Sequence, residues 1–197
     1  MRVFVALDID DAIRARLEQF LDGVRGFAPE ARWVRPESMH VTLKFIGEKS
    51  SEAVDEIKQA LGGVRAGGFE ISFRGHGFFP TAKAPRVFWI GIAASPQLAA
   101  LAKSVDEAAA GLGVPREEHA FSPHLTLARG GGHRGSDAPH RLKGDASNPV
   151  FQRLQEKLAA KRSLEFGTMT AREFFLYQSQ PMRGGARYTR IARFGLE

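Results

Sequence analysis

The pattern of apolar and polar positions divides the chain into alternating strands and helices. Residues 2 to 9 are apolar on both faces of an extended segment, which predicts a central strand. Apolar side chains recur at helical spacing in four stretches, which run from Ile13 to Val24, Val54 to Val64, Leu98 to Leu112 and Val150 to Leu158. Further strands are predicted near residues 31–34, 39–46, 69–79, 86–93, 121–128, 168–178 and 187–194.

The order of these elements is close to βαβαβ twice, which predicts an α+β fold. We expect one bilobal domain over residues 1–197, in which two pseudo-symmetric lobes each carry a mainly antiparallel sheet with helices outside. The two sheets would line a central groove. With 43% hydrophobic residues, a chain of this length can bury a substantial core.

An internal duplication supports the two-lobed arrangement. The tetrapeptide His40-Val41-Thr42-Leu43 recurs at an offset of 84 as His124-Leu125-Thr126-Leu127. The tripeptide Arg2-Val3-Phe4 recurs at the same offset as Arg86-Val87-Phe88. Duplicated halves usually pack around a pseudo-two-fold axis, so equivalent strands would face each other across the groove. We therefore expect His40 and His124 to meet there.

Composition narrows the class of protein without deciding it. The absence of cysteine excludes structural disulfides and thiolate zinc sites and is compatible with a reducing cytosol, so we expect a cytoplasmic protein. Asp8 comes too early for the apolar core of a secretory signal, and no apolar run reaches membrane-spanning length. The net charge of +6 suits a polyanionic substrate, although an ordinary basic surface would give the same value.

Each copy of the motif places an imidazole beside a hydroxyl. Alternate side chains of a strand share a face, so His40 lies with Thr42, and His124 lies with Thr126. An unperturbed imidazole titrates at about 6.5, so one histidine can act as a base while the other acts as an acid. Each threonine can donate a hydrogen bond to a non-bridging phosphate oxygen. These residues suit in-line attack at phosphorus, but they leave open which histidine is the acid.

Other interpretations of the histidines are weaker. A single His-x-Thr in a strand is more often an ordinary half-buried histidine, but two copies at the repeat offset favour a shared site. A metal site could use the histidines, yet no Asp, Glu or Cys stands at ligand spacing near either motif. The chain also lacks a Gly-x-Ser-x-Gly nucleophile elbow. We expect neither a metal nor a cofactor.

The paired motifs, with Phe79-Pro80, the run Pro85-Arg86-Val87-Phe88-Trp89-Ile90-Gly91 and the tail Gly185-Ala186-Arg187-Tyr188, carry a family resemblance. The chain resembles the two-histidine phosphoesterase superfamily and, within it, the RNA 2′,3′-cyclic phosphodiesterases, which are also called 2′-5′ RNA ligases. The resemblance covers essentially the whole length. It implies a bilobal fold and metal-independent hydrolysis of a 2′,3′-cyclic phosphate to a 2′-phosphomonoester.

The resemblance also implies roles for individual residues. His40 would be the proton donor to the departing 3′ oxygen, and His124 would be the proton acceptor that activates water. Thr42 and Thr126 would bind phosphate oxygens. The expected partner is RNA with a 2′,3′-cyclic phosphate end or a small cyclic nucleotide, with no membrane and no obligate protein partner.

Two further positions follow the motif histidines at a spacing of five, namely Phe45 and Arg129. The resemblance makes Arg129 a phosphate ligand and Phe45 a platform for the terminal base. Because five is odd, a regular strand would turn both side chains toward the core. For Arg129, the expected resolution is that the strand has ended before the glycines that follow it. For Phe45, core packing is an equal alternative.

Two rival functions remain open. The chain could act on another small cyclic phosphate or on a 2′-5′ linkage, with weak 2′-5′ ligation as the reverse reaction. It could instead be a non-catalytic RNA or nucleotide binder, although the retention of both motifs argues against this. A polar segment from Gly130 to Ser147 is expected to form a long loop beside the site.

Overall fold

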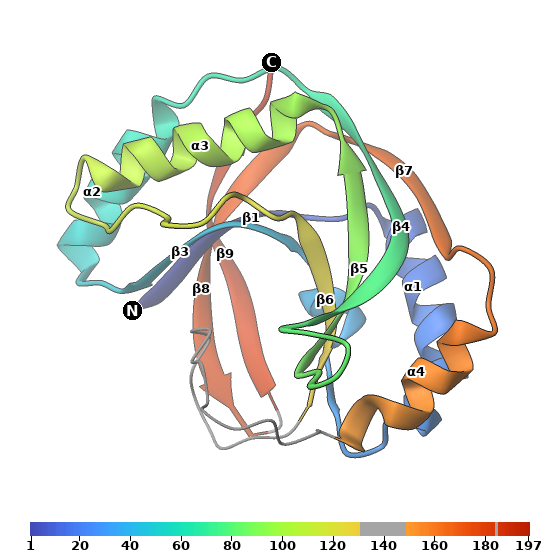
Figure 1. Cartoon of the computed structure of the whole chain (residues 1–197). Coiled ribbons are helices and arrows are strands. Elements are labelled where there is room, and N and C mark those ends of the chain that lie inside the picture. The colour runs from blue at the N-terminus through green and yellow to red at the C-terminus, as the bar shows by residue number, and fades with distance from the viewer. Residues whose placement is uncertain (131–148, 184) are drawn as a thin grey trace.

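A computed structural model describes residues 1–130, 149–183 and 185–197. In this part of the chain, two antiparallel sheets lie inside four α-helices, so the predicted α+β class is confirmed (Figure 1). Almost all of the predicted polar loop falls outside the described residues, as does Gly184. No helix within the described ranges is long and apolar enough to cross a membrane.

The strands form two sheets, which we call sheet A and sheet B. Sheet A has the order β3-β1-β8-β9, with β3 at Val41–Glu48, β1 at Arg2–Leu7, β8 at Glu173–Met182 and β9 at Gly185–Gly195. Sheet B has the order β2-β6-β5-β4-β7, with β2 at Arg32–Trp33, β6 at His124–Arg129, β5 at Val87–Ala94, β4 at Phe69–Phe79 and β7 at Glu165–Ala171. The two motif strands, β3 and β6, contact each other.

The two lobes exchange strands, so neither lobe is built from one half of the sequence. Strand β4 follows β3 along the chain but pairs with β5 in sheet B. Strand β8 follows β7 but pairs with β1 in sheet A. The single strand expected over residues 168–178 is therefore wrong, because β7 and β8 are separated by Arg172 and belong to different sheets. Each half of the chain completes the sheet of the other.

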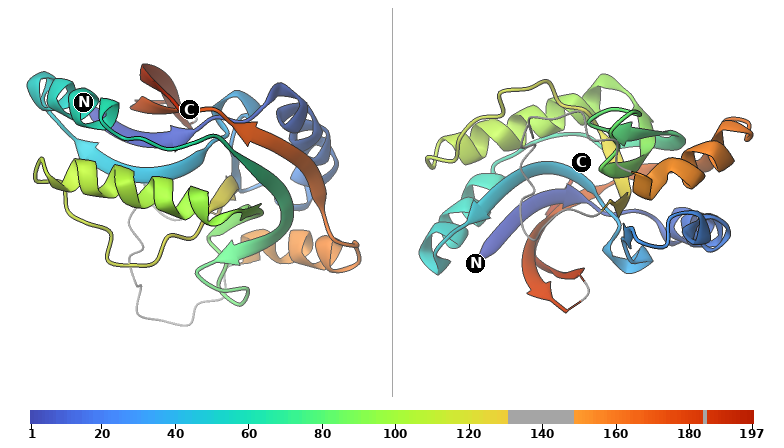
Figure 2. Two further views of the ribbon diagram at one scale, coloured as in Figure 1. Left: turned by 90° about the horizontal axis from the view of Figure 1, so that it is seen from above. Right: turned by 60° about the horizontal axis from the view of Figure 1, so that its bottom comes forward.

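The helices cover the outer sides of the sheets in two groups (Figure 2). One group consists of α2 (Ser51–Gly62) and α3 (Pro96–Ala110), and the other of α1 (Asp11–Val24) and α4 (Gln152–Ala159). Their buried residues keep the predicted helical spacing, as Ile13, Leu17, Leu21 and Val24 do in α1. The prediction that Leu112 belongs to the buried face of α3 is wrong, because the helix ends at Ala110 and Leu112 is exposed.

A buried ion pair joins the two halves of the chain. Lys44, on β3 of sheet A, is only 3% exposed. Its Nζ lies 2.7 Å from a carboxylate oxygen of Asp106 on α3, and it donates to Glu117 at 3.0 Å and to the Pro115 carbonyl at 2.7 Å. Burial alone would raise the pKa of Asp106, but hydrogen bonds from Lys44 and the Glu117 backbone, with the Lys44 charge, hold it below its ordinary value. The contacts tie the first motif strand to the segment that leads to the second motif.

We predict that Lys44→Ala lowers the free energy of unfolding by about 3 kcal/mol, because it leaves Asp106 without its buried partner. The exposed pair of Lys58 and Asp55 is the matched control, and Lys58→Ala should cost less than about 1 kcal/mol. Urea unfolding at pH 7 measures both values. Equal losses in the two variants would show that the buried pair does not hold the two halves of the chain together.

Candidate active site

Both motif histidines are fixed by the same backbone contact. His40 lies just before β3, after the 3₁₀ turn Pro36–Ser38, and its Nδ1 is 2.8 Å from the carbonyl oxygen of Ser38. His124 begins β6, and its Nδ1 is 2.8 Å from the carbonyl oxygen of Ser122. A carbonyl oxygen only accepts, so Nδ1 donates in each case. In the neutral ring this leaves Nε2 unprotonated and able to accept a proton.

A β-bulge lies at the same position in both motif strands. Opposite β1, Thr42 pairs with Ala6 and Lys44 pairs with Val5, so Leu43 is the extra residue. Opposite β5, Thr126 pairs with Trp89 and Ala128 pairs with Phe88, so Leu127 is the extra residue. A bulge shifts the alternation of the strand by one residue. Leu43 and Leu127 also occupy equivalent places in the two tetrapeptides.

The bulges turn Phe45 and Arg129 toward the motif side of their strands. Phe45 pairs with Phe4, two residues from the partner of Thr42, and therefore shares its face. It is 48% exposed, so the core-packing interpretation is wrong. Arg129 still belongs to β6, so the expectation that the strand has ended before it is also wrong. The bulge at Leu127 is what brings Arg129 to the face of Thr126.

The strands that pair with the two motif strands, β1 and β5, are related by an offset one residue shorter than the offset between the motifs. Phe45 and Arg129 stand at an offset of 84 along the sequence, but their cross-strand partners Phe4 and Val87 stand at an offset of 83. The repeated tripeptides found in the sequence are thus one residue out of step with the strand pairing. In structural terms, Ala6 corresponds to Trp89.

Aromatic rings surround each histidine. The His40 ring is 4.8 Å from the ring of Phe4 and 5.1 Å from that of Tyr188, measured between centroids. The His124 ring is 5.0 Å from Phe79 and 6.3 Å from Trp89. Phe79, Trp89 and Tyr188 lie in segments that carried the family resemblance, whereas nothing in the local sequence singled out Phe4 as a neighbour of His40.

The histidines and Arg129 lie within electrostatic reach of one another. Burial lowers the pKa of His40 to about 4, with further lowering by the charges of Arg129 and His124, against the opposing effects of the Ser38 carbonyl and Asp8. Burial and then Arg129 also lower the pKa of His124, against the Ser122 carbonyl. The structure therefore brings together three of the side chains that the sequence placed in one site, namely His40, His124 and Arg129. Both imidazoles are neutral near pH 7 in the absence of an anion.

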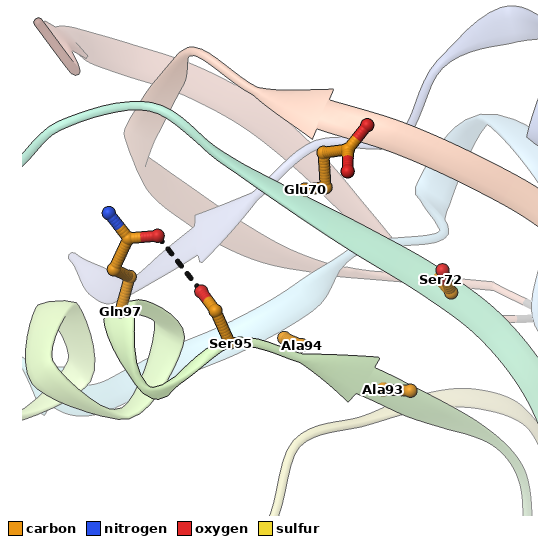
Figure 3. A pocket seen from close by; sticks show the side chains of 6 residues that line it. All are labelled: Glu70, Ser72, Ala93, Ala94, Ser95 and Gln97. Carbon is orange, nitrogen blue, oxygen red and sulfur yellow. Dashed lines mark hydrogen bonds between the residues drawn. The ribbon is translucent and has the colours of Figure 1, made fainter.

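An open pocket of about 540 Å³ carries neither motif. It lies between the start of β4, the end of β5 and the start of α3 (Figure 3). Its polar side chains include Ser95, which donates to Gln97 at 2.9 Å, and Glu70. Within the described residues, no three His, Cys, Asp or Glu side chains form a group suited to a metal ion.

The chain is similar to known proteins in both sequence and fold. The family profile described as LigT like Phosphoesterase matches the chain twice, at residues 7–89 and 90–188. The chain belongs to this family. The RNA 2′,3′-cyclic phosphodiesterase of Archaeoglobus fulgidus is 36% identical over 179 residues, which are 91% of each chain. That of Methanothermobacter thermautotrophicus is 30% identical over 198 residues, covering 100% of this chain and 99% of the relative.

Solved structures share this fold over nearly the whole chain. The crystal structure of E. coli LigT complexed with 3′-AMP superposes with a TM-score of 0.76 at 29% identity, covering 99% of this chain and 97% of LigT. The TT0787 protein of Thermus thermophilus has a TM-score of 0.75 at 27% identity, covering 100% of this chain and 98% of that protein. The family predicted from the paired motifs is therefore confirmed.

The lowered pKa of His40 predicts a pH dependence of stability. A histidine whose pKa is about 4 in the folded chain and about 6.5 in the unfolded chain stabilises the fold fully above pH 6.5. This stability is lost as the pH falls toward 4, because protonation then favours the unfolded chain. We expect the free energy of unfolding of His40→Gln to fall less than that of the wild type between pH 6.5 and 4. Parallel pH curves for the two proteins would contradict the lowered pKa.

Proposed function

We propose that this chain hydrolyses the 2′,3′-cyclic phosphate at the 3′ end of RNA to a 2′-phosphomonoester, without a metal ion. The observation that carries the proposal is the pair of equivalent histidines, each with Nδ1 committed to a backbone carbonyl, that share Arg129. The names of the curated relatives and the 3′-AMP complex of E. coli LigT support the substrate class.

The two histidines act on opposite sides of the phosphorus. Nε2 of His124 accepts a proton from water as the water oxygen bonds to phosphorus in line with the P–O3′ bond. That bond breaks, and Nε2 of His40, protonated in the substrate complex, gives its proton to O3′. Binding of the phosphate anion offsets the charge of Arg129, which favours protonation of His40. Afterwards His124 releases its proton to solvent and His40 takes one up from solvent, which restores both residues for the next turnover.

Negative charge gathers on the non-bridging oxygens of the five-coordinate phosphorus. Thr42 and Thr126 lie two residues after the histidines, and their hydroxyls donate hydrogen bonds to these oxygens. Arg129 supplies a fixed positive charge on the same face as Thr126. Interactions that strengthen as this charge develops lower the barrier to the chemical step.

An asymmetry between the lobes supports the assignment of the acid. At the equivalent positions after the motifs, sheet A presents the exposed ring of Phe45 and sheet B presents Arg129. The terminal base stacks on the aromatic side, against Phe45, and the phosphate faces Arg129. The leaving oxygen O3′ belongs to the ribose that carries this base, so it departs on the side of His40. Water then attacks from the side of His124.

Two rival functions make different predictions from the same site. A phosphodiesterase for another small cyclic phosphate, or for a 2′-5′ linkage, would use the same catalytic residues but prefer a substrate without an RNA chain. A binding protein would hold the cyclic end without opening it. Ligation to a 2′-5′ linkage is the reverse reaction with a ribose hydroxyl in place of water, and the high concentration of water favours hydrolysis.

The direct experiment is incubation of the purified protein with EDTA and an oligoribonucleotide that ends in a 2′,3′-cyclic phosphate. We expect full activity and a 2′-phosphate product. Loss of activity in EDTA or a 3′-phosphate product would contradict the mechanism. Activity on a 2′,3′-cyclic mononucleotide or a 2′-5′ dinucleotide with none on the RNA end would favour the first rival, and binding without turnover would favour the second.

The two histidines should behave as one catalytic unit. We expect His40→Ala and His124→Ala each to lower kcat by about a hundredfold or more, with the double variant little worse than the worse single variant. Losses that multiply would mean that the two residues do not act in the same transition state. Substrate titration with each variant measures the effect.

The role of Arg129 can be separated from general charge. Arg129→Ala should raise KM and lower kcat, and Arg129→Lys should restore only part of the loss because lysine cannot make a bidentate contact. Lys103→Ala is the control, since it removes the same charge from an exposed position on α3. Unchanged kinetics in Arg129→Ala would remove this residue from the site.

A further inference from the structure

A carboxylate lies across from one motif histidine and has no counterpart across from the other. Strand β1 pairs Leu7 with Val41, so the next position of this antiparallel register sets Asp8 opposite His40. In sheet B the residue opposite His124 is Gly91. Asp8 and Gly91 stand at an offset of 83, which is the structural offset of these strands. The pseudo-symmetry of the site is therefore broken at this position.

Asp8 is the centre of a network that reaches the walls around His40. Its Oδ1 accepts a hydrogen bond from Arg14 on α1 at 3.0 Å, and its Oδ2 is ion-paired with Arg190 on β9. Arg14 also donates to the carbonyl of Pro36, at the start of the turn whose Ser38 carbonyl fixes the His40 ring. The carboxylate thus holds the turn that orients the imidazole.

Arg190 extends the network to the aromatic side of the site. Its Nε donates to the hydroxyl of Tyr177 at 3.3 Å, and the Tyr177 ring stacks on Phe4 with centroids 5.2 Å apart. Phe4 in turn packs against the His40 ring. Arg190 also lies over the Phe175 ring, at 4.5 Å from its centroid. The same ion pair therefore positions the wall that contacts His40.

The charges around the two histidines differ in the described part of the chain. The titratable and charged groups near His40 are Asp8, Arg14 on α1, Tyr177 on β8, Tyr188 and Arg190 on β9, and His124 and Arg129 on β6. Asp8 favours the protonated form of His40, whereas Arg129 and His124 oppose it. Among the described residues, no carboxylate has this effect on His124.

We propose that Asp8 is the positioning residue that makes His40, rather than His124, the proton donor. The inference rests on the proposed function and gives a physical cause for its division of roles. When the substrate phosphate offsets Arg129, the positive charge that acts on both histidines is reduced. Asp8 then favours protonation of His40 alone, against the burial that lowers the pKa of His40 to about 4 in the free protein. Asp8 exchanges no proton itself. It stabilises the Nε2–H of His40 through space and holds the turn that orients the ring.

The test uses two variants that break the same ion pair but change the charge near His40 in opposite directions. Asp8→Asn removes the negative charge, and Arg190→Gln removes the positive charge that balances it. The descending limb of the kcat profile reports the acid, since activity falls where the acid loses its proton. Asp8→Asn should shift this limb down by about one pH unit, and Arg190→Gln should shift it up. The ascending limb, set by His124, should stay in place.

A purely structural role predicts a different result. Both variants would then lower kcat with no opposite movement of the descending limb, and that outcome would overturn the proposal. Asp8→Glu keeps the charge and should return the limb toward its wild-type position. Asp10→Asn is the matched control, because it neutralises an exposed carboxylate two residues away and should move neither limb. If Asp8→Asn does not fold, the direction in which Arg190→Gln moves the descending limb still tests the proposal, with Asp8→Glu as the variant that keeps the charge.

Titration of the histidine Cε1 protons by NMR, in saturating inorganic phosphate, keeps the inference separate from the proposed function. His40 should titrate at lower pH in Asp8→Asn and at higher pH in Arg190→Gln, while His124 stays unchanged. Absence of turnover in the wild type would refute the proposed function alone, because the NMR shifts need no reaction. Unchanged His40 titration in an active enzyme would refute the role of Asp8 alone.

Discussion

In a regular strand, side chains five positions apart point to opposite faces, yet the proposed site uses residues five positions after each histidine. One inserted residue in each motif strand resolves the conflict. Leu43 and Leu127 are bulged, so the residues that follow them change face, and Phe45 and Arg129 come to lie with the motif threonines. Bulges often redirect a side chain next to an active site. Here the same bulge occurs twice. It directs the aromatic ring of Phe45 toward the motif face in one lobe and the positive charge of Arg129 toward it in the other.

A second constraint is that the two motifs must be held at a fixed distance from each other. The exchange of β4 and β8 between the sheets makes each lobe depend on both halves of the chain. The buried amine of Lys44 adds a direct link from β3 to α3 and to the segment before His124. Lys44 directly follows the bulged Leu43, so the residue that joins the two halves of the chain lies beside the one that sets the geometry of the site. The positions of His40 and His124 are therefore coupled through the core.

Much of the fold and the pairing of the two motif histidines in one candidate site could be predicted from the sequence. Helical spacing in α1 and the apolar run of β1 reflect burial, which leaves a local pattern. The exchanged strands leave none, because pairing partners are chosen over long range, and no Gly or Pro marks the boundary at Arg172 between β7 and β8. The bulges leave no local signal either, since a leucine at a bulge looks like any core leucine in the sequence.

The residues found only in the structure are those whose role depends on the pairing register of the strands. In the sequence, Asp8 looks like the end of a strand. Its place opposite His40 follows from the strand pairing, in which β1 and β5 are related by an offset of 83 residues, whereas the repeated tripeptides suggest 84. Arg190 and Tyr177 reach the site only because β8 lies beside β1.

The central claim is that two equivalent histidines stand on opposite sides of one phosphate and that the lobes differ in what they contribute around it. A crystal structure with a nucleoside 2′,3′-cyclic vanadate, which imitates five-coordinate phosphorus, tests this most directly. The account predicts one apical oxygen at Nε2 of His124, the apical 3′ oxygen at Nε2 of His40, and the equatorial oxygens at Thr42, Thr126 and Arg129. Both histidines on one side of the vanadium, or the 3′ oxygen at His124, would contradict it.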